Sequence, residues 1–377
     1  MKKIFIIAGE TSGDILAADI IKALKQKDPT IVIQGIGGPQ SRSAGLTESL
    51  FPMADLSLMG IVEIVPKIPQ MLSRINQTVA AIAKLNPDVV LSIDCPDFSF
   101  RVQKKVKAKR LNIKQVHYVA PTVWAWRAGR AKKIAKFLDG VLCLFPFEPP
   151  YFEKVGLSAL YTGHPVIARY EKAPLPLEAR TALGYTNADN VVGVLLGSRR
   201  GELTKHGDIF LQVAKRMLEN KNVRILVPTL PHIYDDVISL VRKHLGVDDR
   251  VLVVSNPDLQ TTYFRAMDSA LAVSGTVGLE LAVAGVPHVI GYKTHPLTAK
   301  IIKKVIKVKY AHLANIILDK EIVPECIQED CSIEKISSEL VNINKNIQKS
   351  GFDGVIKRMK TEKTPAETIV QYLNNGF

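Results

Sequence analysis

Several features that define common protein classes are missing from this chain of 377 residues. No apolar run is long enough to span a bilayer as a helix. The four cysteines lack the paired spacing of a metal site, which favours reduced thiols over a disulfide framework. The apolar run at residues 4–8 is too short for a signal peptide and ends in an acidic glycine turn. These absences indicate a globular protein of the cytoplasm.

Acidic residues are also in deficit, with 36 against 50 basic residues and a net charge of +14. Such an excess predicts an anionic partner, which could be a nucleic acid, a membrane surface or a phosphorylated substrate. Aromatic residues are sparse among the basic ones, so nucleic-acid binding is not expected. A membrane surface or a phosphorylated substrate fits the composition better.

Short apolar runs alternate with amphipathic segments along most of the chain. They are continuous rather than alternating in polarity, as strands buried on both faces of a parallel sheet should be. The expected strands are 3–8, 31–35, 89–94, 114–119, 140–145, 191–196, 224–228, 251–254, 268–273 and 288–291. The pattern predicts two successive doubly wound α/β domains, 1–168 and 169–344. Helices over 345–377 are expected to pack back on the first domain or on a partner.

Two turns of the first domain carry polar groups after expected strands, where ligands bind in open α/β sheets. The turn from Gly9 to Asp14 offers glycines for close backbone approach, the Ser12 hydroxyl and the Glu10 carboxylate. It matches neither a dinucleotide fingerprint nor a P-loop, which argues against NAD and ATP. Asp94 emerges from a buried strand, so we expect loss of solvation to raise its pKa and suit it to act as a general base. A capping or loop carboxylate is the alternative for Asp94.

The second domain has two matching turns. Gly197 and Ser198 bring backbone amides to a helix start, and Arg199 or Arg200 could pair with a diphosphate. A further turn consists of Ser274, Gly275 and Thr276, with Glu280 one helical turn later, where a carboxylate could accept ribose hydroxyls. An ordinary capped βα turn is the favoured interpretation of the second stretch when it is taken alone. Both turns follow strands and would look into the same cleft, where they could form the two phosphate-binding walls of one nucleotide site.

The apolar segment 58–72 is interrupted by Gly60, Pro66 and Pro69 and therefore predicts an exposed flap rather than a regular core helix. Its apolar residues are Met59, Ile61, Ile64, Val65, Ile68 and Leu72. Segment 299–310 gathers lysines on one helical face. Together these features indicate contact with an anionic membrane surface. Trp124 and Trp126 could stack on a sugar or pack in a core, and packing is favoured.

Six stretches together resemble one family, lipid-A-disaccharide synthases. They are Ala8-Gly-Glu-Thr-Ser-Gly-Asp14, Met59-Gly-Ile-Val-Glu63, Ile93-Asp-Cys-Pro-Asp-Phe98, His117-Tyr-Val-Ala-Pro-Thr-Val-Trp-Ala-Trp126, Gly197-Ser-Arg199 with Glu202, and Ser274-Gly-Thr276 with Glu280. They occur in the family's order. The resemblance implies a GT-B fold, with two Rossmann-like domains facing a central cleft. It also implies inverting transfer of 2,3-diacylglucosamine from UDP-2,3-diacylglucosamine to 2,3-diacylglucosamine 1-phosphate.

The resemblance also implies roles for individual residues. Asp94 corresponds to the base for the acceptor hydroxyl, Arg199 to an essential arginine and Glu280 to a ribose ligand, while Glu10 and Asn315 match other functionally important positions. No cofactor or metal is implied. Expected partners are the two lipid substrates, the inner face of the inner membrane and a second copy with exchanged C-terminal parts. A UDP-sugar epimerase or hydrolase of the same fold, or a non-catalytic UDP-binding scaffold, are the alternatives.

Overall fold

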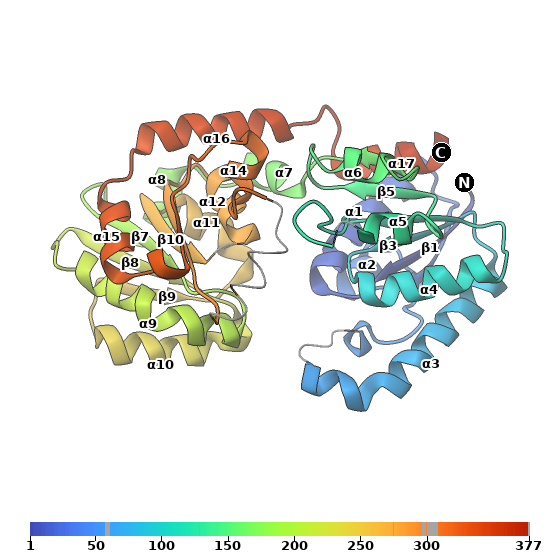
Figure 1. Cartoon of the computed structure of the whole chain (residues 1–377), viewed down its shortest axis with the longest axis horizontal. Coiled ribbons are helices and arrows are strands. Elements are labelled where there is room, and N and C mark those ends of the chain that lie inside the picture. Colours follow the sequence, from blue (N-terminus) through green and yellow to red (C-terminus); the bar gives the residue numbers. More distant parts are fainter. Residues whose placement is uncertain (57–60, 128, 274, 296–298, 300–307, 376–377) are drawn as a thin grey trace. The chain divides into compact units, whose positions relative to one another are not determined.

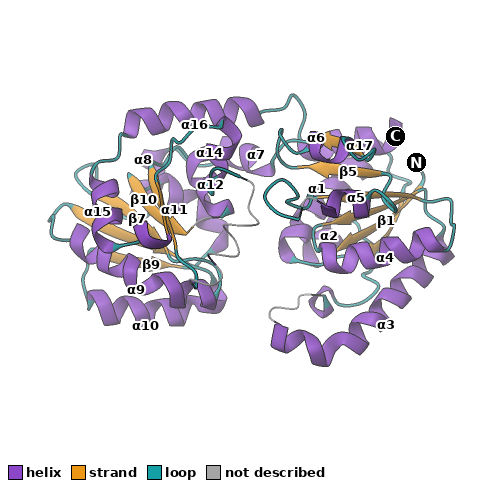
Figure 2. Cartoon of the chain, viewed as in Figure 1, coloured by secondary structure: helices purple, strands orange, loops and turns teal. Residues whose placement is uncertain are grey.

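The chain forms two compact α/β units. The first comprises Met1–His164 and Thr361–Phe377, and the second Pro165–Lys360. The computed structural model describes residues 1–56, 61–127, 129–273, 275–295, 299 and 308–375, of which 61–67 are described by their backbone alone. Each unit holds one sheet with helices on its faces (Figures 1 and 2).

The sheet of the first unit is parallel, in the order β2-β1-β3-β4-β5-β6. Its strands are β1 (Lys3–Ala8), β2 (Val32–Ile36), β3 (Val89–Ile93), β4 (Lys114–Tyr118), β5 (Gly140–Cys143) and β6 (Ser158–Tyr161). Its helices are α1 (Thr11–Lys27), α2 (Pro39–Ala44), α3 (Ile61–Leu85), α4 (Pro96–Ala108), α5 (Gly129–Ile134), α6 (Pro149–Glu153) and α17 (Pro365–Asn375). The chain reverses its direction of strand addition between β1 and β3, which lie side by side.

The second unit repeats this plan with the order β12-β11-β10-β7-β8-β9, again parallel. Its strands are β7 (Asn190–Leu195), β8 (Val223–Pro228), β9 (Val251–Val254), β10 (Ser269–Val273), β11 (His288–Tyr292) and β12 (Glu325–Ile327). Its helices are α7 (Pro165–Glu171), α8 (Pro176–Ala182), α9 (Arg200–Met217), α10 (Tyr234–Leu245), α11 (Gln260–Arg265), α12 (Thr276–Val283), α14 (Leu313–Leu318), α15 (Ile333–Val341) and α16 (Lys345–Met359). Here the reversal falls between β7 and β10.

The central strands are buried on both faces because helices cover both sides of each sheet. Every residue of β3 and β10 is buried, and the apolar residues of β1 are all at most 1% exposed. Continuous apolar runs therefore end at these strands' last residues, and the polar turns that follow lie at the carboxyl edge of the sheet. Both reversal points, where crevices form in such folds, carry turns singled out from the sequence.

All the expected strands are present, with ends that differ by one or two residues. Two further strands, β6 and β12, were not predicted. Both are short edge strands, and the residues of β6 are exposed or half-buried. An edge strand is covered on fewer sides, so it lacks the apolar run by which the central strands are recognised.

The segment predicted to be an exposed flap rather than a regular core helix is helical where the structure describes it. Helix α3 begins at Ile61 and continues through Pro66 and Pro69 to Leu85. Its C-terminal half packs in the core through Ile75, Val79 and Ile82. Packing of that half stabilises the helix, and the prolines lie in the other half.

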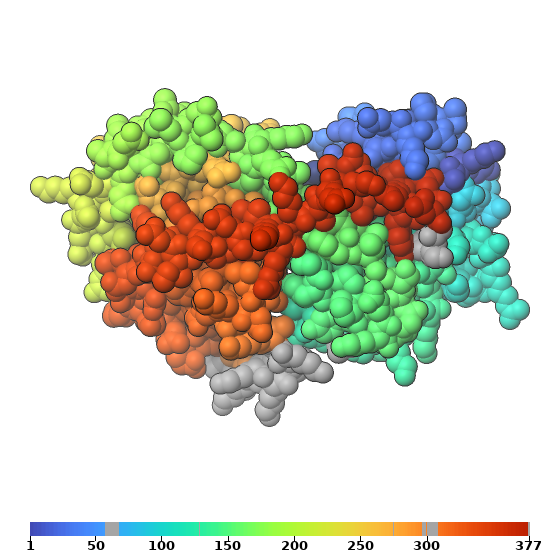
Figure 3. Space-filling model, turned by 90° about the horizontal axis from the view of Figure 1, so that it is seen from above, coloured from blue at the N-terminus to red at the C-terminus, as the bar shows by residue number. Residues whose placement is uncertain are grey.

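The last two helices belong to different units. Helix α16 packs on α12 and α14 of the second unit, whereas α17 packs on α1 of the first. Ile369, Val370 and Leu373 of α17 are part of the first unit's core, and Tyr372 Oη lies 3.0 Å from Ser158 Oγ of β6. In the space-filling view the C-terminal residues, in red, lie against the green residues of the first unit (Figure 3).

Candidate functional site

In the first unit the turns after β1 and β3 touch each other. A Cβ atom added at Gly9 would lie 2.8 Å from Cys95 Sγ, and one at Gly13 would lie 3.1 Å from the Ile93 carbonyl oxygen. Glycine is therefore required sterically at Gly9. This packing brings Ser12 and Asp94 together, and the Ser12 hydroxyl donates to Asp94 Oδ2 at 3.2 Å.

Asp94 is held in an unusual backbone conformation. Asp94 and Cys95 both have left-handed φ angles, +54° and +46°, which cost energy in non-glycine residues and concentrate at functional sites. The Cys95 N–H donates to Asp94 Oδ1 at 2.9 Å, and the Asp94 N–H donates to the Tyr118 carbonyl oxygen at 3.0 Å. The side chain is half-buried at the sheet edge. The geometry leaves a carboxylate oriented by Ser12 and able to take a proton.

Negative charge surrounds the Cys95 thiol. Burial, followed by the negative charge of Glu10 and then of Asp94, raises the pKa of Cys95 to about 12. The thiol is therefore protonated at neutral pH and is no nucleophile. Glu10 is the exposed residue that precedes α1, and its charge acts at the same place as that of Asp94.

Asp14 connects the glycine turn to the loop after β2. It is buried and accepts hydrogen bonds from the backbone N–H groups of Gly38, Gln40 and Ser41 at 2.7–3.0 Å. It thus binds the start of α2. This bonding ties the loop after β2 to the glycine turn, so Asp14 supports the site without facing a ligand.

The second unit contains a cavity of about 430 Å³ at the carboxyl ends of its strands. Residues that follow β7, β8, β9 and β10 line it. They include Gly197, Ser198, Arg199, Glu202, Thr229, Leu230, Asn256, Gln260, Tyr263, Gly275, Thr276 and Glu280. Its volume is typical of a site for a small molecule. Thr229, Asn256, Gln260 and Tyr263 were not predicted, although Thr229 and Asn256 could have been found as polar residues shortly after strands.

The turn after β7 is held by a residue of α9, the helix that follows it. Gly197 has a φ of +107°, and a Cβ atom there would lie 2.6 Å from Glu202. Glu202 Oε2 accepts from the Ser198 N–H at 2.8 Å. The Arg199 side chain is 72% exposed and lies 3.9 Å from Glu202, whereas Arg200 pairs with Asp236 at 2.8 Å. Of the two arginines left open by the sequence, Arg199 lines the cavity and Arg200 is engaged elsewhere.

The turn after β10 leads into α12 through Gly275 and Thr276, while Ser274 lies outside the described residues. Glu280 of α12 faces the cavity, and its Oε2 lies 3.5 Å from Nη1 of Arg169 on α7. Burial raises the pKa of Glu280, and the positive charge of Arg169 partly opposes the shift. Within the described part of the chain this half-buried carboxylate has only a long ion pair, so it has capacity to accept further hydrogen bonds.

Asn315 lies at a distance from the cavity lining and is completely buried. Its Nδ2 donates to the Val323 carbonyl oxygen and to Glu325 Oε1, and its Oδ1 accepts from the N–H groups of Ile322 and Val323, all at 2.8–3.0 Å. The amide is thus fully used within the protein. It fixes the loop before β12.

The two tryptophans have separate environments. Trp124 is buried and its Nε1–H donates to Glu148 Oε1 at 3.0 Å, while Trp126 is 42% exposed. Burial raises the pKa of Glu148 to about 7, against the lowering effect of hydrogen bonds to it. Nothing in the local sequence distinguishes Glu148 from a solvated glutamate, so it was not predicted.

The predicted lipid-facing segment is only partly described. Met59 lies outside the described residues, as do the side chains of Ile61, Ile64 and Val65. Ile68 and Leu72 on α3 are each 45% exposed. Most of the lysine-rich segment 299–310 also lies outside. Among the described helices, none combines the length and apolarity needed to cross a bilayer, and the described residues contain no cluster of three or more metal-binding side chains.

Two successive doubly wound units of this kind form the GT-B fold, and solved structures share it. The Methanocaldococcus jannaschii UDP-GlcNAc 2-epimerase in complex with UDP-GlcNAc and UDP matches with a TM-score of 0.64 at 14% identity, covering 99% of this chain and 100% of that one. The MurG protein of Acinetobacter baumannii matches with a TM-score of 0.61 at 12% identity, covering 100% of each chain. At such identities the likeness shows the fold alone.

The sequence comparisons are more specific. The model of the lipid-A-disaccharide synthetase family matches residues 4–371. The lipid-A-disaccharide synthase of Ruegeria pomeroyi is 43% identical, covering 91% of this chain and 87% of the relative. That of Paramagnetospirillum magneticum is 36% identical, covering 99% and 98%. The chain belongs to the lipid-A-disaccharide synthetase family. The predicted GT-B fold and inverting glycosyltransferase activity in lipid A synthesis are thereby confirmed.

Proposed function

We propose that the second unit binds UDP-2,3-diacylglucosamine as the glycosyl donor. The observation that carries this proposal is the cavity in which Arg199, the Gly275-Thr276 turn and Glu280 meet. Arg199 and the N-terminus of α12 would bind the diphosphate, because guanidinium groups and helix N-termini favour anions. Glu280 would accept the ribose hydroxyls. Solved structures of the same fold include complexes with UDP, which agrees with a uridine nucleotide.

In the first unit, Asp94 would act as the general base. The acceptor hydroxyl of diacylglucosamine 1-phosphate attacks the anomeric carbon of the donor and loses its proton to Asp94. The bond from that carbon to the diphosphate oxygen breaks, and UDP leaves with the electron pair. Arg199 and the α12 N-terminus would stabilise the departing charge. Attack from the face opposite the leaving group yields the β-1,6-linked disaccharide 1-phosphate.

Two further residues that the sequence predicted would support this chemistry, Asn315 by positioning a loop and Glu10 through its charge. Asn315 would act as a positioning residue for the loop before β12, since all four of its hydrogen bonds are internal. Glu10 would act on the acceptor side, where its negative charge adds to that of Asp94. Gly9, Ser12, Gly197 and Ser198 would shape the two turns.

The lipid substrates imply work at a membrane surface. Ile68 and Leu72 remain exposed on α3, and the chain carries a net charge of +14. We propose peripheral binding to the anionic inner face of the inner membrane through this part of α3. Co-sedimentation with anionic but not neutral vesicles tests it, and its loss on the double change Ile68→Ser, Leu72→Ser is expected.

The exchanged dimer also remains a proposal. Helix α17 docks on α1 through Ile369, Val370 and Leu373, and a short stretch that begins at Thr361 connects it to the second unit. An exchange between two chains could preserve these contacts. Light scattering of the purified protein should give twice the chain mass, and a monomer mass would contradict the exchange.

The function is tested by a transfer assay with both lipid substrates and mass detection of the disaccharide. Asp94→Asn should abolish product formation without loss of folding. Asp97→Asn is the matched control, because Asp97 lies three residues further on, is almost fully exposed and has only a distant partner in Arg130, at 3.7 Å. Full activity of Asp94→Asn would remove Asp94 from the mechanism. Turnover of water-soluble UDP-N-acetylglucosamine alone would favour the epimerase or hydrolase alternative.

A further inference from the structure

The loop that follows β4 contains both tryptophans, and it presents one of them to solvent. Trp124 is 7% exposed and Trp126 is 42% exposed, although only one residue separates them. The proposed chemistry uses neither. A large aromatic side chain is normally buried or at an interface, so the exposure of the Trp126 ring calls for an explanation.

The buried tryptophan anchors the loop to the protein. Glu148 accepts not only the Trp124 indole N–H but also the backbone N–H groups of Leu144 and Phe145, at 3.0 and 2.9 Å. The ring of Phe147 packs edge-on against Trp124, with centroids 5.1 Å apart. A buried carboxylate with three donors fixes the loop in one position, which limits where Trp126 can lie.

The exposed tryptophan is held in place and carries a guanidinium group. Its Nε1–H donates to Thr122 Oγ1 at 3.2 Å, and Cζ of Arg127 lies 4.1 Å from the centre of its ring. Arg127 adopts a left-handed φ of +52°, and Val119 at the start of the loop one of +73°. Such backbone strain in non-glycine residues is characteristic of functional sites.

The Arg127 charge is left without an acidic partner. Among the residues that the structure describes, no carboxylate lies within ion-pair distance of Arg127, whereas Arg130 nearby pairs with Asp97 at 3.7 Å. A guanidinium stacked on an aromatic ring keeps its N–H groups free at the edge, where they can bind a phosphate in a bidentate manner. An indole ring beside it can cover the apolar face of a sugar.

The loop also adjoins the proposed catalytic base. The Asp94 N–H donates to the carbonyl oxygen of Tyr118, the last residue of β4. The loop therefore begins beside the turn that holds Asp94. A sugar 1-phosphate with its hydroxyl at Asp94 keeps its phosphate away from that carboxylate, and a cation with no carboxylate partner among the described residues is suited to bind the phosphate.

We propose that Trp126 and Arg127 bind the phosphorylated sugar head of the acceptor, Trp126 by stacking on the ring and Arg127 by pairing with the 1-phosphate. The inference rests on the proposed function, because it takes the acceptor to be a sugar 1-phosphate. It assigns recognition of that phosphate to the first unit, separately from the donor diphosphate.

The first experiment compares two acceptors, diacylglucosamine 1-phosphate and diacylglucosamine, in wild type and in Arg127→Gln. The variant should raise KM for the phosphorylated acceptor about tenfold or more, since a charge-assisted bidentate contact is lost. It should leave the KM for the donor, and the rate with the unphosphorylated acceptor, within about twofold. An equal loss with both acceptors would overturn the proposal.

The control for this variant is Arg110→Gln. Arg110 is exposed and has a left-handed φ of +54°, like Arg127, but it follows α4 and precedes the amino end of β4. It should change neither acceptor KM. If wild type forms no disaccharide with either acceptor, the proposed function fails, and the binding experiment below still decides the inference.

The second experiment measures binding without turnover. Iodide should quench the fluorescence of exposed Trp126 and not that of buried Trp124. Glucosamine 1-phosphate should protect Trp126 from iodide at least several-fold better than glucosamine, and Arg127→Gln should abolish the difference. Equal protection by the two sugars, or protection by phosphatidylglycerol vesicles alone, would overturn the proposal, the latter in favour of a membrane contact.

Discussion

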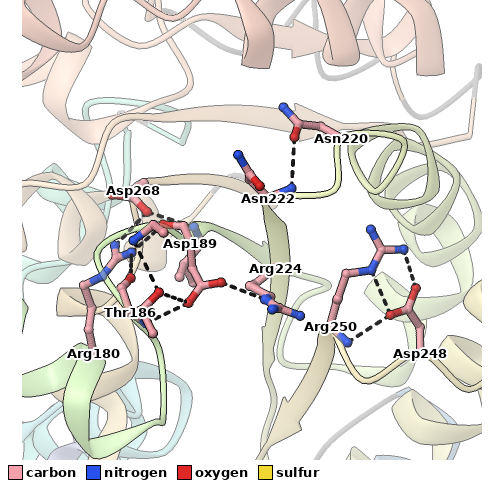
Figure 4. A network of polar contacts seen from close by, with 11 residues as sticks. Arg180, Thr186, Asp189, Asn220, Asn222, Arg224, Asp248, Arg250 and Asp268 are labelled. Atoms are coloured by element: carbon pink, nitrogen blue, oxygen red, sulfur yellow. Dashed lines mark hydrogen bonds and ion pairs between the residues drawn. The ribbon is translucent and has the colours of Figure 1, made fainter.

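The two ends of the second unit's sheet use the same charged residue types in opposite ways. At the amino ends of the strands, arginines and aspartates pair closely (Figure 4). Arg180 lies 2.7 Å from Asp268, Arg224 2.8 Å from Asp189, and Arg250 2.6 Å from Asp248. These carboxylates are also bound by backbone N–H groups, such as that of Val191 on Asp268 at 2.8 Å.

At the carboxyl ends the charges that line the cavity are held loosely. Arg199 is 3.9 Å from Glu202, and Glu280 is 3.5 Å from Arg169. Arg199, Glu202 and Glu280 line the cavity. The difference teaches that pairing within the protein stabilises one end, whereas weak pairing at the other leaves charges for a ligand. The amino end should therefore respond to substitution in stability and the carboxyl end in binding and turnover.

The largest expected effect is at Arg199. Arg199→Ala should lower kcat/KM by about 10²–10³-fold, the loss found when a donor to the transition-state charge is removed. Arg200→Ala is the control from the adjacent position, since Arg200 pairs with Asp236. It should stay within about threefold in the same transfer assay, because exposed ion pairs contribute little. Similar losses in both variants would contradict the distinction.

The second prediction concerns the amino end. Arg180→Ala leaves Asp268 without its cation and removes bonds to the carbonyl oxygens of Thr186 and Asp189. The free energy of unfolding should fall by about 3 kcal/mol, as expected for breaking a largely buried pair. Urea denaturation measures it. The dissociation constant for UDP below the unfolding transition should not change, and weaker UDP binding would show that the two ends are coupled.

The third prediction returns to the cavity. Glu280→Gln should weaken UDP binding by about tenfold, because a neutral amide is a poorer acceptor for hydroxyl groups than a carboxylate. Titration calorimetry with UDP and with uridine-free pyrophosphate separates the ribose effect from the diphosphate effect. Pyrophosphate binding should be retained.

Glu280 also predicts a pH dependence of stability. The pKa of Glu280 is raised in the folded protein. Its stabilising contribution to the free energy of unfolding is therefore complete below the unfolded pKa near 4.5, and it is lost as pH rises through the folded pKa. Glu280→Gln should therefore gain thermal stability relative to wild type as pH rises from 4.5 to 7. An opposite trend would show that Arg169 dominates over burial.

The smallest effect is expected at Asp189, where stability depends on pH with the opposite sign to that at Glu280. The hydrogen bond from Arg224, first among several, lowers the pKa of Asp189 to about 2. Its contribution to stability is present above the unfolded pKa near 3.8 and is lost as pH falls towards 2. Asp189→Asn should lower Tm by a few degrees at pH 7 and by less near pH 2. A constant difference across this range would rule out the pairing as its cause.

Most of the fold could be predicted because buried parallel strands have an unmistakable pattern. The runs at β1, β3, β7 and β10 are mostly apolar, and each ends in a polar or glycine turn. The exposed edge strand β6 carries no such run. Helix α3 was missed at Pro66 and Pro69 because local propensity disfavours proline, while packing of Ile75 and Val79 further along sustains the helix.

The site was predictable as a set of turns and unpredictable in its contacts. Asp94, Arg199 and Glu280 were found because each follows a strand. The partners of Asp14, at the start of α2, could not be predicted because they are 24 to 27 residues away. The choice between Arg199 and Arg200 depended on Asp236 of α10, which is equally remote in sequence.

The sequence by itself determined the alternation of strands and helices, the polar turns at the carboxyl ends of the strands, and the family. These depend on apolar periodicity and on short motifs, which are local. Only the tertiary structure decided which charges are paired and which are left for a ligand, and which tryptophan is exposed. Those outcomes depend on Asp236, Glu148 and Arg169, whose distances from Arg200, Trp124 and Glu280 are set by packing between elements far apart in the chain.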